Sequence, residues 1–373
     1  MILGFELTVF CYIALAAVFR LTLKLGYVTA LALLTLSSSL LLFAVNPVLA
    51  AYLLLQVAWV LALYWLCVRY PAFANRIAWL SFLGLLPLNL EIWLGGSEQF
   101  GSFFSRMDLV GLEQVFWSTG AAFFVVKSFV GLKEAIKSKK LHLLPLLAGL
   151  TFLPSFPAGP IFGSAPFRRE NVKALLDPSE LVKCTFLMGW GAAAFYILAP
   201  ALRNVAASNG DSLLGTVADI YLNFAALFLD FSGYTIMALS VASYFGFKLP
   251  ENFNRPYLAT SIQKFWQRWH MSLSKFISQY LFKPFVRSTG SPRKGIFLAF
   301  VFVGLWHEIT VGYFLWGIGH GIAMSMAMKP PALWHWMIRA LPSTLQSLIG
   351  WFLTMTWVSI LSYLANIEVS KIL

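Results

Sequence analysis

Residues 294–328 read KGIFLAFVFVGLWHEITVGYFLWGIGHGIAMSMAM, an apolar stretch that carries His307, Glu308 and His320. An ionisable group at membrane depth costs free energy, roughly 2 to 4 kcal/mol, and is retained where it faces protein or a water-filled cavity. Two histidines and a carboxylate in such a stretch therefore indicate a functional site inside the membrane. The stretch also predicts two consecutive helices that meet near Gly312.

The composition is that of a membrane protein with many spans. The chain has 373 residues, of which 59% are hydrophobic and 11% are charged, and its mean hydropathy is +0.76. Soluble domains carry about 25% charged residues. No polar stretch is long enough to fold by itself, so we predict one membrane-embedded domain over residues 1–373. The cysteines lie in apolar runs and indicate buried side chains rather than disulfides or a metal site: Cys11, Cys67 and Cys184.

Apolar runs near the length of a membrane helix, ~20 residues, recur along the sequence. They predict spans at 4–19, 27–45, 48–68, 77–95, 114–131, 182–202, 213–232 and 347–366. With the paired helices of 295–328 and with re-entrant and interfacial helices, this predicts an all-α protein of about nine to eleven membrane segments. Basic residues gather on alternate turns, above all in 127–140, which places that turn in the cytoplasm and the N-terminus outside.

Residues 142–162 are apolar but are interrupted by Pro145, Pro154, Pro157 and Pro160. Each proline removes a backbone donor, so this run does not make a regular spanning helix. We therefore predict a re-entrant segment that enters the membrane and returns. Irregular backbone at membrane depth survives only where protein buries it or where it lines a cavity. This predicts that Pro157, Gly159 and Pro160 line the functional cavity.

Residues 261–281 carry an apolar stripe at helical spacing, with Lys264, Arg268 and Lys275 on the other face. The pattern predicts one amphipathic helix at the cytoplasmic interface. Two interpretations of the basic face stay open: the positive-inside bias of a cytoplasmic loop, or a docking surface for an anionic donor or an acidic carrier. The second predicts that these three residues, together with Trp306, bind the donor.

Two further ionisable residues lie in or beside apolar segments. His270 falls on the edge of the amphipathic stripe, where a histidine is either an interfacial anchor or part of the site. Asp230 lies beside Ser232 and Gly233. Its carboxylate is either a helix N-cap that accepts backbone N–H bonds or a polar group that lines the cavity.

Several ordered sequence blocks resemble those of the membrane-bound O-acyltransferases. They are DFSGY (230–234), FGFKLPENFNRPY (245–257), FWQRWHMSLSKFI (265–277), GLWHE (304–308) and LWGIGHG (315–321). SFPAGPI (155–161) looks like a further family segment with shorter spacing. The sequence is most similar to the bacterial branch of alginate O-acetylation and teichoic-acid D-alanyl transfer proteins, over about residues 152–321. This resemblance implies helices around a central funnel or tunnel, with the active site inside the membrane.

By this resemblance His307 matches the family's catalytic histidine, and His270, His320 and Asp230 match positions that support it. Glu308 stands where the family usually has glycine, which adds a carboxylate beside the base. Attack of a hydroxyl on a thioester needs a base near pH 7, and imidazole, with an ordinary pKa of about 6.5, suits that task. No nucleophile elbow or Cys–His pair points to a covalent intermediate, so the sequence favours direct transfer.

The resemblance implies transfer of an acyl group, acetyl in the first place or else D-alanyl, to a hydroxyl of an exported polysaccharide or cell-envelope polymer. The implied donor is acyl-CoA or an acylated phosphopantetheine carrier protein on the cytoplasmic side, and no bound cofactor is expected. The implied partners are membrane lipid, the carrier, and a periplasmic or extracellular acyltransferase or esterase, but no nucleic acid. The implied location is the bacterial cytoplasmic (inner) membrane.

The main alternative is a proton-coupled transporter or flippase of an envelope precursor, in which His307, Glu308 and Asp230 form a proton relay. Such folds usually show an internal two-fold repeat, and we find none in the sequence. A structural scaffold for a partner enzyme is a third hypothesis. It gives no reason for ionisable groups in apolar helices.

Overall fold

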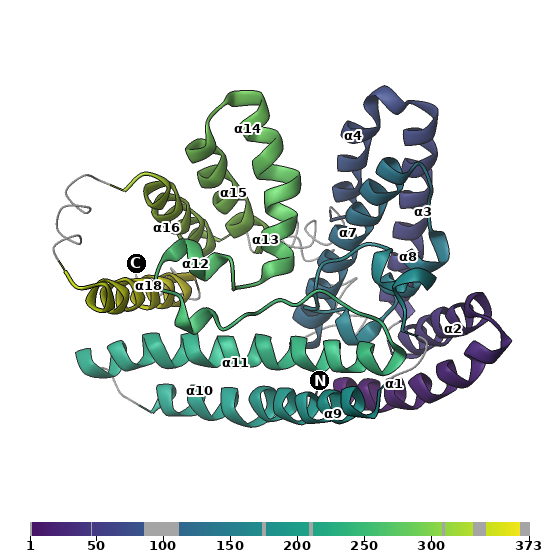
Figure 1. Ribbon diagram of the computed structural model, residues 1–373, viewed down its shortest axis with the longest axis horizontal. Coiled ribbons are helices and arrows are strands. Elements are labelled where there is room, and N and C mark those ends of the chain that lie inside the picture. The colour runs from purple at the N-terminus through teal and green to yellow at the C-terminus, as the bar shows by residue number, and fades with distance from the viewer. Residues whose placement is uncertain are drawn as a thin grey trace, which may run out of the picture. The chain divides into compact units, whose positions relative to one another are not determined.

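The computed structural model describes residues 2–45, 47–85, 112–173, 177–208, 212–307, 310–330 and 341–365. These residues form helices and connecting segments without a β-strand, so the all-α prediction is confirmed for them (Figure 1). The chain divides into two compact units: the first unit is 1–190 with 234–250, and the second unit is 191–233 with 251–373. The prediction of one functional membrane domain stays a prediction.

Five helices in the described ranges are long and apolar enough to cross a membrane: 27–44, 50–69, 178–207, 213–245 and 343–365. Their lengths follow from uninterrupted apolar runs, which cover the bilayer core at a rise of about 1.5 Å per residue. The protein is therefore a multi-pass membrane protein. Much of the predicted span 77–95 lies outside the described residues.

The first unit contains α1 (Ile2–Thr22), α2 (Tyr27–Val45), α3 (Pro47–Arg69), α4 (Ala74–Ile77), η3 (Ala78–Leu85), α7 (Leu112–Ser138), α8 (Leu143–Leu150) and most of α9 (Pro178–Ala193). The predicted spans 4–19, 27–45, 48–68 and 114–131 each lie inside one of these helices. The span predicted at 77–95 begins as the 3-10 helix η3 instead of an α-helix.

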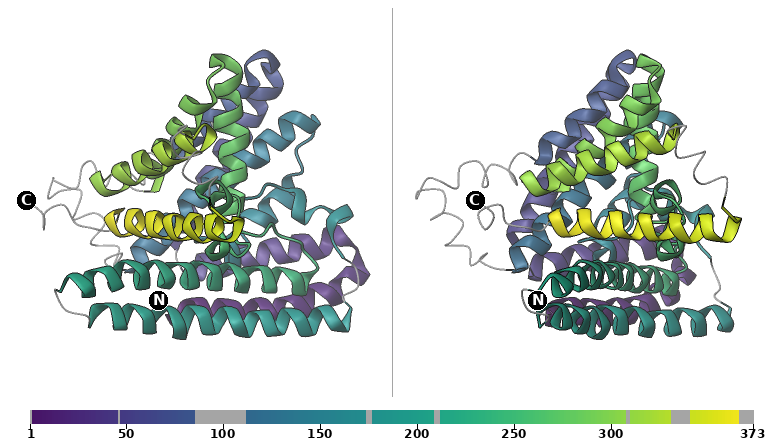
Figure 2. Two further views of the ribbon diagram at one scale, coloured as in Figure 1. Left: turned by 60° about the vertical axis from the view of Figure 1, so that its left-hand side comes forward. Right: turned by 90° about the vertical axis from the view of Figure 1, so that its left-hand side faces the viewer.

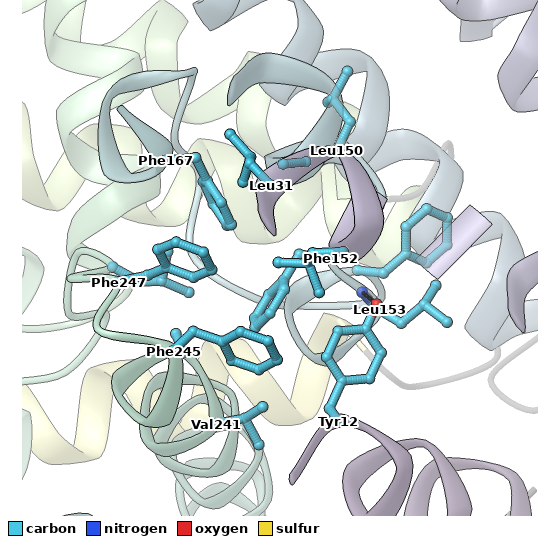
Figure 3. Close-up of a cluster of buried hydrophobic side chains, with 14 of the residues drawn as sticks. Tyr12, Leu31, Leu150, Phe152, Leu153, Phe167, Val241, Phe245 and Phe247 are labelled. Atoms are coloured by element: carbon cyan, nitrogen blue, oxygen red, sulfur yellow. Dashed lines mark hydrogen bonds between the residues drawn. The ribbon is translucent and has the colours of Figure 1, made fainter. Parts of the chain in front are cut away.

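Buried aromatic rings form the centre of the first unit (Figure 3). The Phe152 ring lies 5.1 Å from Tyr12 of α1 and 5.7 Å from Phe245, the last residue of α11 (Leu213–Phe245), both edge-on. The ring of Phe167 lies 5.7 Å from the Phe152 ring, and the ring of Phe247 lies 6.2 Å from it. Packing rather than water exclusion holds helices together in a membrane, so this cluster fixes the start of the proline-rich segment.

The run 142–162 has the irregular backbone that its prolines predict. Helix α8 ends at Leu150, and only single 3-10 turns follow before Phe167. Pro145 is tolerated because it lies in the first turn of α8, where no intrahelical donor is lost. The entry of this segment into a membrane and its return stay a prediction.

The second unit begins within the helical run formed by α9, the π-helical turn η7 (Ala194–Leu198) and α10 (Ala199–Ala207). It continues with α11 up to Gly233. The later helices are α12 (Ile262–Trp266), α13 (Met271–Ile277), η9 (Ser278–Phe282), α14 (Lys283–Thr289), α15 (Pro292–His307), α16 (Val311–Met328) and α18 (Ser343–Ala365). In the turned views of Figure 2, α16 and α18 are neighbouring helices, in agreement with their contacts.

The structure corrects two sequence predictions in the second unit. Asp230 lies inside the continuous helix α11, so the N-cap interpretation is wrong. The single amphipathic helix predicted over 261–281 is also wrong, because α12 ends at Trp266 and α13 begins only at Met271. The predicted apolar stripe is nevertheless confirmed by burial of Phe265, Trp266, Trp269, Leu273, Phe276 and Ile277.

Helices α15 and α16 pack with almost no space between their backbones. A Cβ atom added at Gly304 would lie 2.3 Å from the carbonyl oxygen of Tyr313, and one added at Gly317 would lie 2.8 Å from that of Phe300. Small residues allow this approach, as is common between membrane helices. Helix α15 ends at His307 and α16 begins at Val311, so Gly312 lies within the first turn of α16. The Thr310 hydroxyl accepts a hydrogen bond from Tyr313 N and caps α16.

Candidate active site

His307 ends α15 and is an exposed residue. Three aromatic rings border it: Trp306 at 5.1 Å, Tyr313 at 5.7 Å in a nearly parallel arrangement, and Trp316 at 5.9 Å edge-on. The close α15–α16 packing brings these rings together from both helices. His307 is therefore an exposed histidine bordered by three aromatic rings.

His320 lies three residues after Gly317 on α16 and is only 1% exposed. Its Nδ1 accepts a hydrogen bond of 3.3 Å from the Trp266 indole N–H of α12. Its ring lies 4.5 Å from Trp316, which also meets the His307 ring at 5.9 Å. One indole thus contacts both histidines, and the hydrogen bond fixes the ring orientation of His320.

His270 is the last of the four residues between α12 and α13 and is 3% exposed. Phe231 of α11 meets its ring edge-on at 4.9 Å. Burial lowers the pKa of the His270 imidazole, and the nearby His307 lowers it further. His270 is therefore neutral at pH 7.

Asp230 forms an ion pair with Arg203 of α10, and both side chains are partly exposed. The neighbouring residue, Phe231, is the one that packs on His270. Sequence reasoning missed Arg203, although an acid in an apolar helix requires a partner and the preceding helix carries this arginine. Glu308 lies outside the described residues.

The predicted donor-binding residues belong to the second unit. Lys264 and Lys275 are exposed and Arg268 is half-buried. Lys264 Nζ donates to Thr260 Oγ1 at 2.9 Å. Trp306 is half-buried against His307. The basic residues of this face are thus accessible to a ligand, and their role in donor binding stays a prediction.

Pro157, Gly159 and Pro160 belong to the first unit and are buried. Their segment is held at its start by Lys127 of α7, whose Nζ donates to Ser155 O at 2.6 Å and to Ser155 Oγ at 3.1 Å. The same Nζ lies 4.6 Å from the centre of the Phe162 ring. Sequence reasoning missed this contact, although a lysine in an apolar run requires a polar partner.

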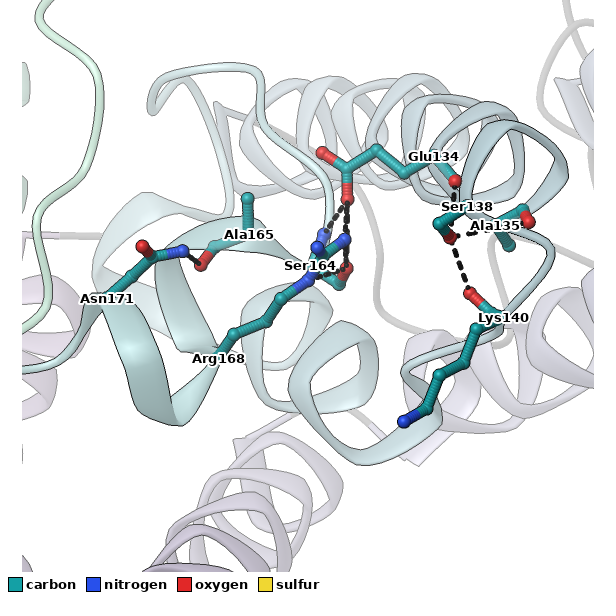
Figure 4. A network of polar contacts seen from close by, with 8 residues as sticks. All are labelled: Glu134, Ala135, Ser138, Lys140, Ser164, Ala165, Arg168 and Asn171. Atoms are coloured by element: carbon teal, nitrogen blue, oxygen red, sulfur yellow. Dashed lines mark hydrogen bonds and ion pairs between the residues drawn. The ribbon is translucent and has the colours of Figure 1, made fainter.

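Glu134, seven residues after Lys127 on α7, holds the other end of the segment (Figure 4). Its Oε2 accepts hydrogen bonds from Ser164 N at 2.9 Å, from Ser164 Oγ at 2.8 Å and from Arg168 Nη2 at 3.1 Å. Residues seven apart share a helix face. One face of α7 therefore fastens both ends of the proline-rich segment.

Ser155→Ala is expected to destabilise the first unit by about 1 to 3 kcal/mol, because it leaves the buried Lys127 amine one acceptor short. The measurement is the thermal unfolding midpoint of the protein in nanodiscs. The matched control is Ser128→Ala on α7. The Ser128 hydroxyl is buried and makes no hydrogen bond in the described part of the chain, so its removal is expected to be neutral or stabilising. Equal midpoints for the two variants would contradict the role of Ser155.

The profile of the MBOAT, membrane-bound O-acyltransferase family, matches residues 5–364. The chain belongs to this family. It is 29% identical over 216 residues to the teichoic acid D-alanyltransferase of Bacillus subtilis (strain 168), which covers 52% of this chain and 53% of that protein.

Two further MBOAT relatives have other names. The peptidoglycan O-acetyltransferase of Helicobacter pylori is 28% identical over 235 residues, 59% of this chain and 43% of that protein. The probable alginate O-acetylase AlgI of Pseudomonas syringae pv. tomato is 28% identical over 289 residues, 70% of this chain and 55% of that protein. The chain spans about half the length of these relatives.

Proposed function

We propose that this chain is a membrane-embedded O-acyltransferase that moves an acyl group from a thioester to a hydroxyl, with His307 as the general base. The observation that carries the assignment is exposure. His307 is exposed, whereas His270 and His320 are 3% and 1% exposed. A general base must come within about 2.6–3.2 Å of the proton that it removes, and an exposed imidazole meets that requirement.

The proposed reaction is a direct transfer. The acceptor hydroxyl oxygen attacks the thioester carbonyl carbon while His307 takes the hydroxyl proton. The carbon–sulfur bond then breaks, the ester remains on the acceptor, and the imidazolium returns the proton to the departing thiolate. Trp306, Tyr313 and Trp316 surround the imidazole with apolar surface, which suits a reaction that must exclude water.

The other predicted residues act in support. The oriented ring of His320 and the ring of His307 both contact Trp316, and His270 presents a neutral imidazole. Asp230 and Arg203 are a charged pair beside the contact of Phe231 with His270. We assign these residues to positioning and electrostatics rather than to direct proton transfer.

The proposed acyl group is acetyl, with D-alanyl as the alternative, and the acceptor is an exported polysaccharide or cell-envelope polymer. The names of the relatives support both acyl groups. We propose acyl-CoA or an acylated phosphopantetheine carrier protein as donor. The proposed location is the bacterial cytoplasmic membrane with the N-terminus outside, because basic residues gather on alternate turns.

The test of donor and acyl group uses inside-out membrane vesicles that contain this chain. They are supplied in turn with labelled acetyl-CoA, an acetylated carrier protein and a D-alanylated carrier protein. We expect one of these donors to yield label in a polymer ester that mild alkali releases. Absence of labelled ester with all three donors, in vesicles that retain the acceptor polymer, would contradict the proposed function.

Lys264→Gln combined with Arg268→Gln is expected to raise the KM for the donor about two- to tenfold, because two positive charges are lost from its docking surface. The effect is expected to shrink as salt increases. The control is Lys24→Gln with Lys137→Gln, which removes the same charge from exposed residues of the first unit. An unchanged KM at low salt would reduce the basic face to a signal of membrane topology.

A further inference from the structure

His270 has an unusual backbone. Its φ is 43° and its ψ is 54°, the left-handed conformation that residues other than glycine rarely adopt. His270 is the N-cap residue of α13 and lies four residues after the end of α12 at Trp266, and Phe231 meets its ring edge-on at 4.9 Å. Strain of this kind persists only where surrounding contacts enforce it, and it is frequent at functional sites.

Hydrogen bonds from one short segment enforce the turn from both sides. Before the turn, Asn254 N donates to Arg268 O at 2.9 Å. After the turn, Met271 N donates to Asn252 O at 2.9 Å, and Ser272 Oγ donates to Asn252 Oδ1 at 2.6 Å. Asn252 thus accepts bonds from two consecutive residues that follow His270, one through its backbone and one through its side chain.

The Asn252 side chain has no other anchor in the described residues. It is 1% exposed, Ser272 is 4% exposed, and Asn252 Nδ2 makes no hydrogen bond there. A buried amide with an unused donor is unfavourable by itself. Its single bond to Ser272 therefore supplies the reason for a buried asparagine at this position.

We propose that Asn252 is a positioning residue for His270. Its side chain holds Ser272 at the start of α13, which keeps the turn at His270 in its left-handed conformation and the His270 ring packed on Phe231. Without this bond the turn relaxes and the imidazole leaves its buried position. The kinetic consequence rests on the proposed function, whereas the structural consequence does not.

The structural test is modification of histidines by diethyl pyrocarbonate in nanodiscs, read by mass spectrometry at each histidine. In the wild-type protein His270 is expected to react slowly because it is buried. Asn252→Ala and Ser272→Ala are each expected to raise the rate at His270 at least fivefold and to leave the rate at His320 unchanged. Asn254→Ala is the matched control, since it keeps the backbone bond to Arg268 and removes only an exposed side chain.

The kinetic test compares the same variants. Asn252→Ala and Ser272→Ala are each expected to lower kcat about tenfold with little change in the donor KM. The double variant is expected to lose less than the sum of the two single losses, because each single variant already removes the bond between Asn252 and Ser272. A slow rate at His270 in a folded Ser272→Ala variant would overturn the proposal. If the variants raise the reaction rate at His270 as expected but the wild-type protein has no transferase activity, the proposed function alone would be overturned.

Discussion

Replacing His307 by alanine is expected to lower acyl transfer by about 10²- to 10⁴-fold, the range of a general base. The side chain is exposed at the end of α15, so its loss removes the proton acceptor without opening a cavity in the core. The measurement is kcat with a saturating thioester, together with the unfolding midpoint, which is expected to stay near that of the wild type.

His142→Ala is the control for this variant, because His142 is a partly exposed histidine of the first unit without a predicted role. It is expected to retain wild-type activity. An His307→Ala protein that keeps more than a tenth of the wild-type kcat would remove His307 from the catalytic role.

Gly304→Ala is expected to disrupt the α15–α16 hairpin. The new Cβ atom would meet the Tyr313 carbonyl oxygen at 2.3 Å, and backbone on both helices has to move. Overpacking of this kind costs about 1–3 kcal/mol. Activity is expected to fall with stability, because the movement displaces Tyr313 and Trp316 from His307. The measurements are the unfolding midpoint and the transfer rate.

Gly189→Ala on α9 is the matched control, since a Cβ atom there has no neighbour within 4 Å. The higher helix propensity of alanine is expected to leave that variant as stable as the wild type or more stable. The same unfolding midpoint for both alanine variants would show that the close contact at Gly304 carries no energetic weight.

Apolar run length predicted most of the described spans, because a membrane leaves helices as the only economical way to satisfy the backbone. The spans at 27–45 and 48–68 lie within α2 and α3 almost residue for residue. The proline pattern likewise predicted the irregular backbone that follows Leu150. These are local properties, and local sequence is enough to read them.

Tertiary hydrogen bonds decided the features that the sequence did not reveal. The periodicity of 261–281 continues past Trp266, where α12 ends, and tertiary hydrogen bonds to Asn252 and Asn254 hold the turn before α13. The residues around Asp230 are compatible with a helix N-cap. In the structure Asp230 lies inside the long helix α11 and forms an ion pair with Arg203. Neither partner can be chosen from spacing alone.

The candidate site shows the same division. Sequence blocks singled out His307 and His320, and the structure adds that one indole, Trp316, contacts both. The difference in burial between the histidines, which carries the proposed role of His307, depends on packing of α12 against α16. No periodicity in a single segment encodes that difference.

The most direct measurement follows a thioester with separate labels on the acyl group and the thiol part, added to purified protein in proteoliposomes with a hydroxyl acceptor. The account predicts that labelled ester and free thiol appear in equal amounts, and that both disappear in His307→Ala. Passage of the intact thioester or of the acceptor across the membrane, without ester formation, would contradict it and would favour a transporter.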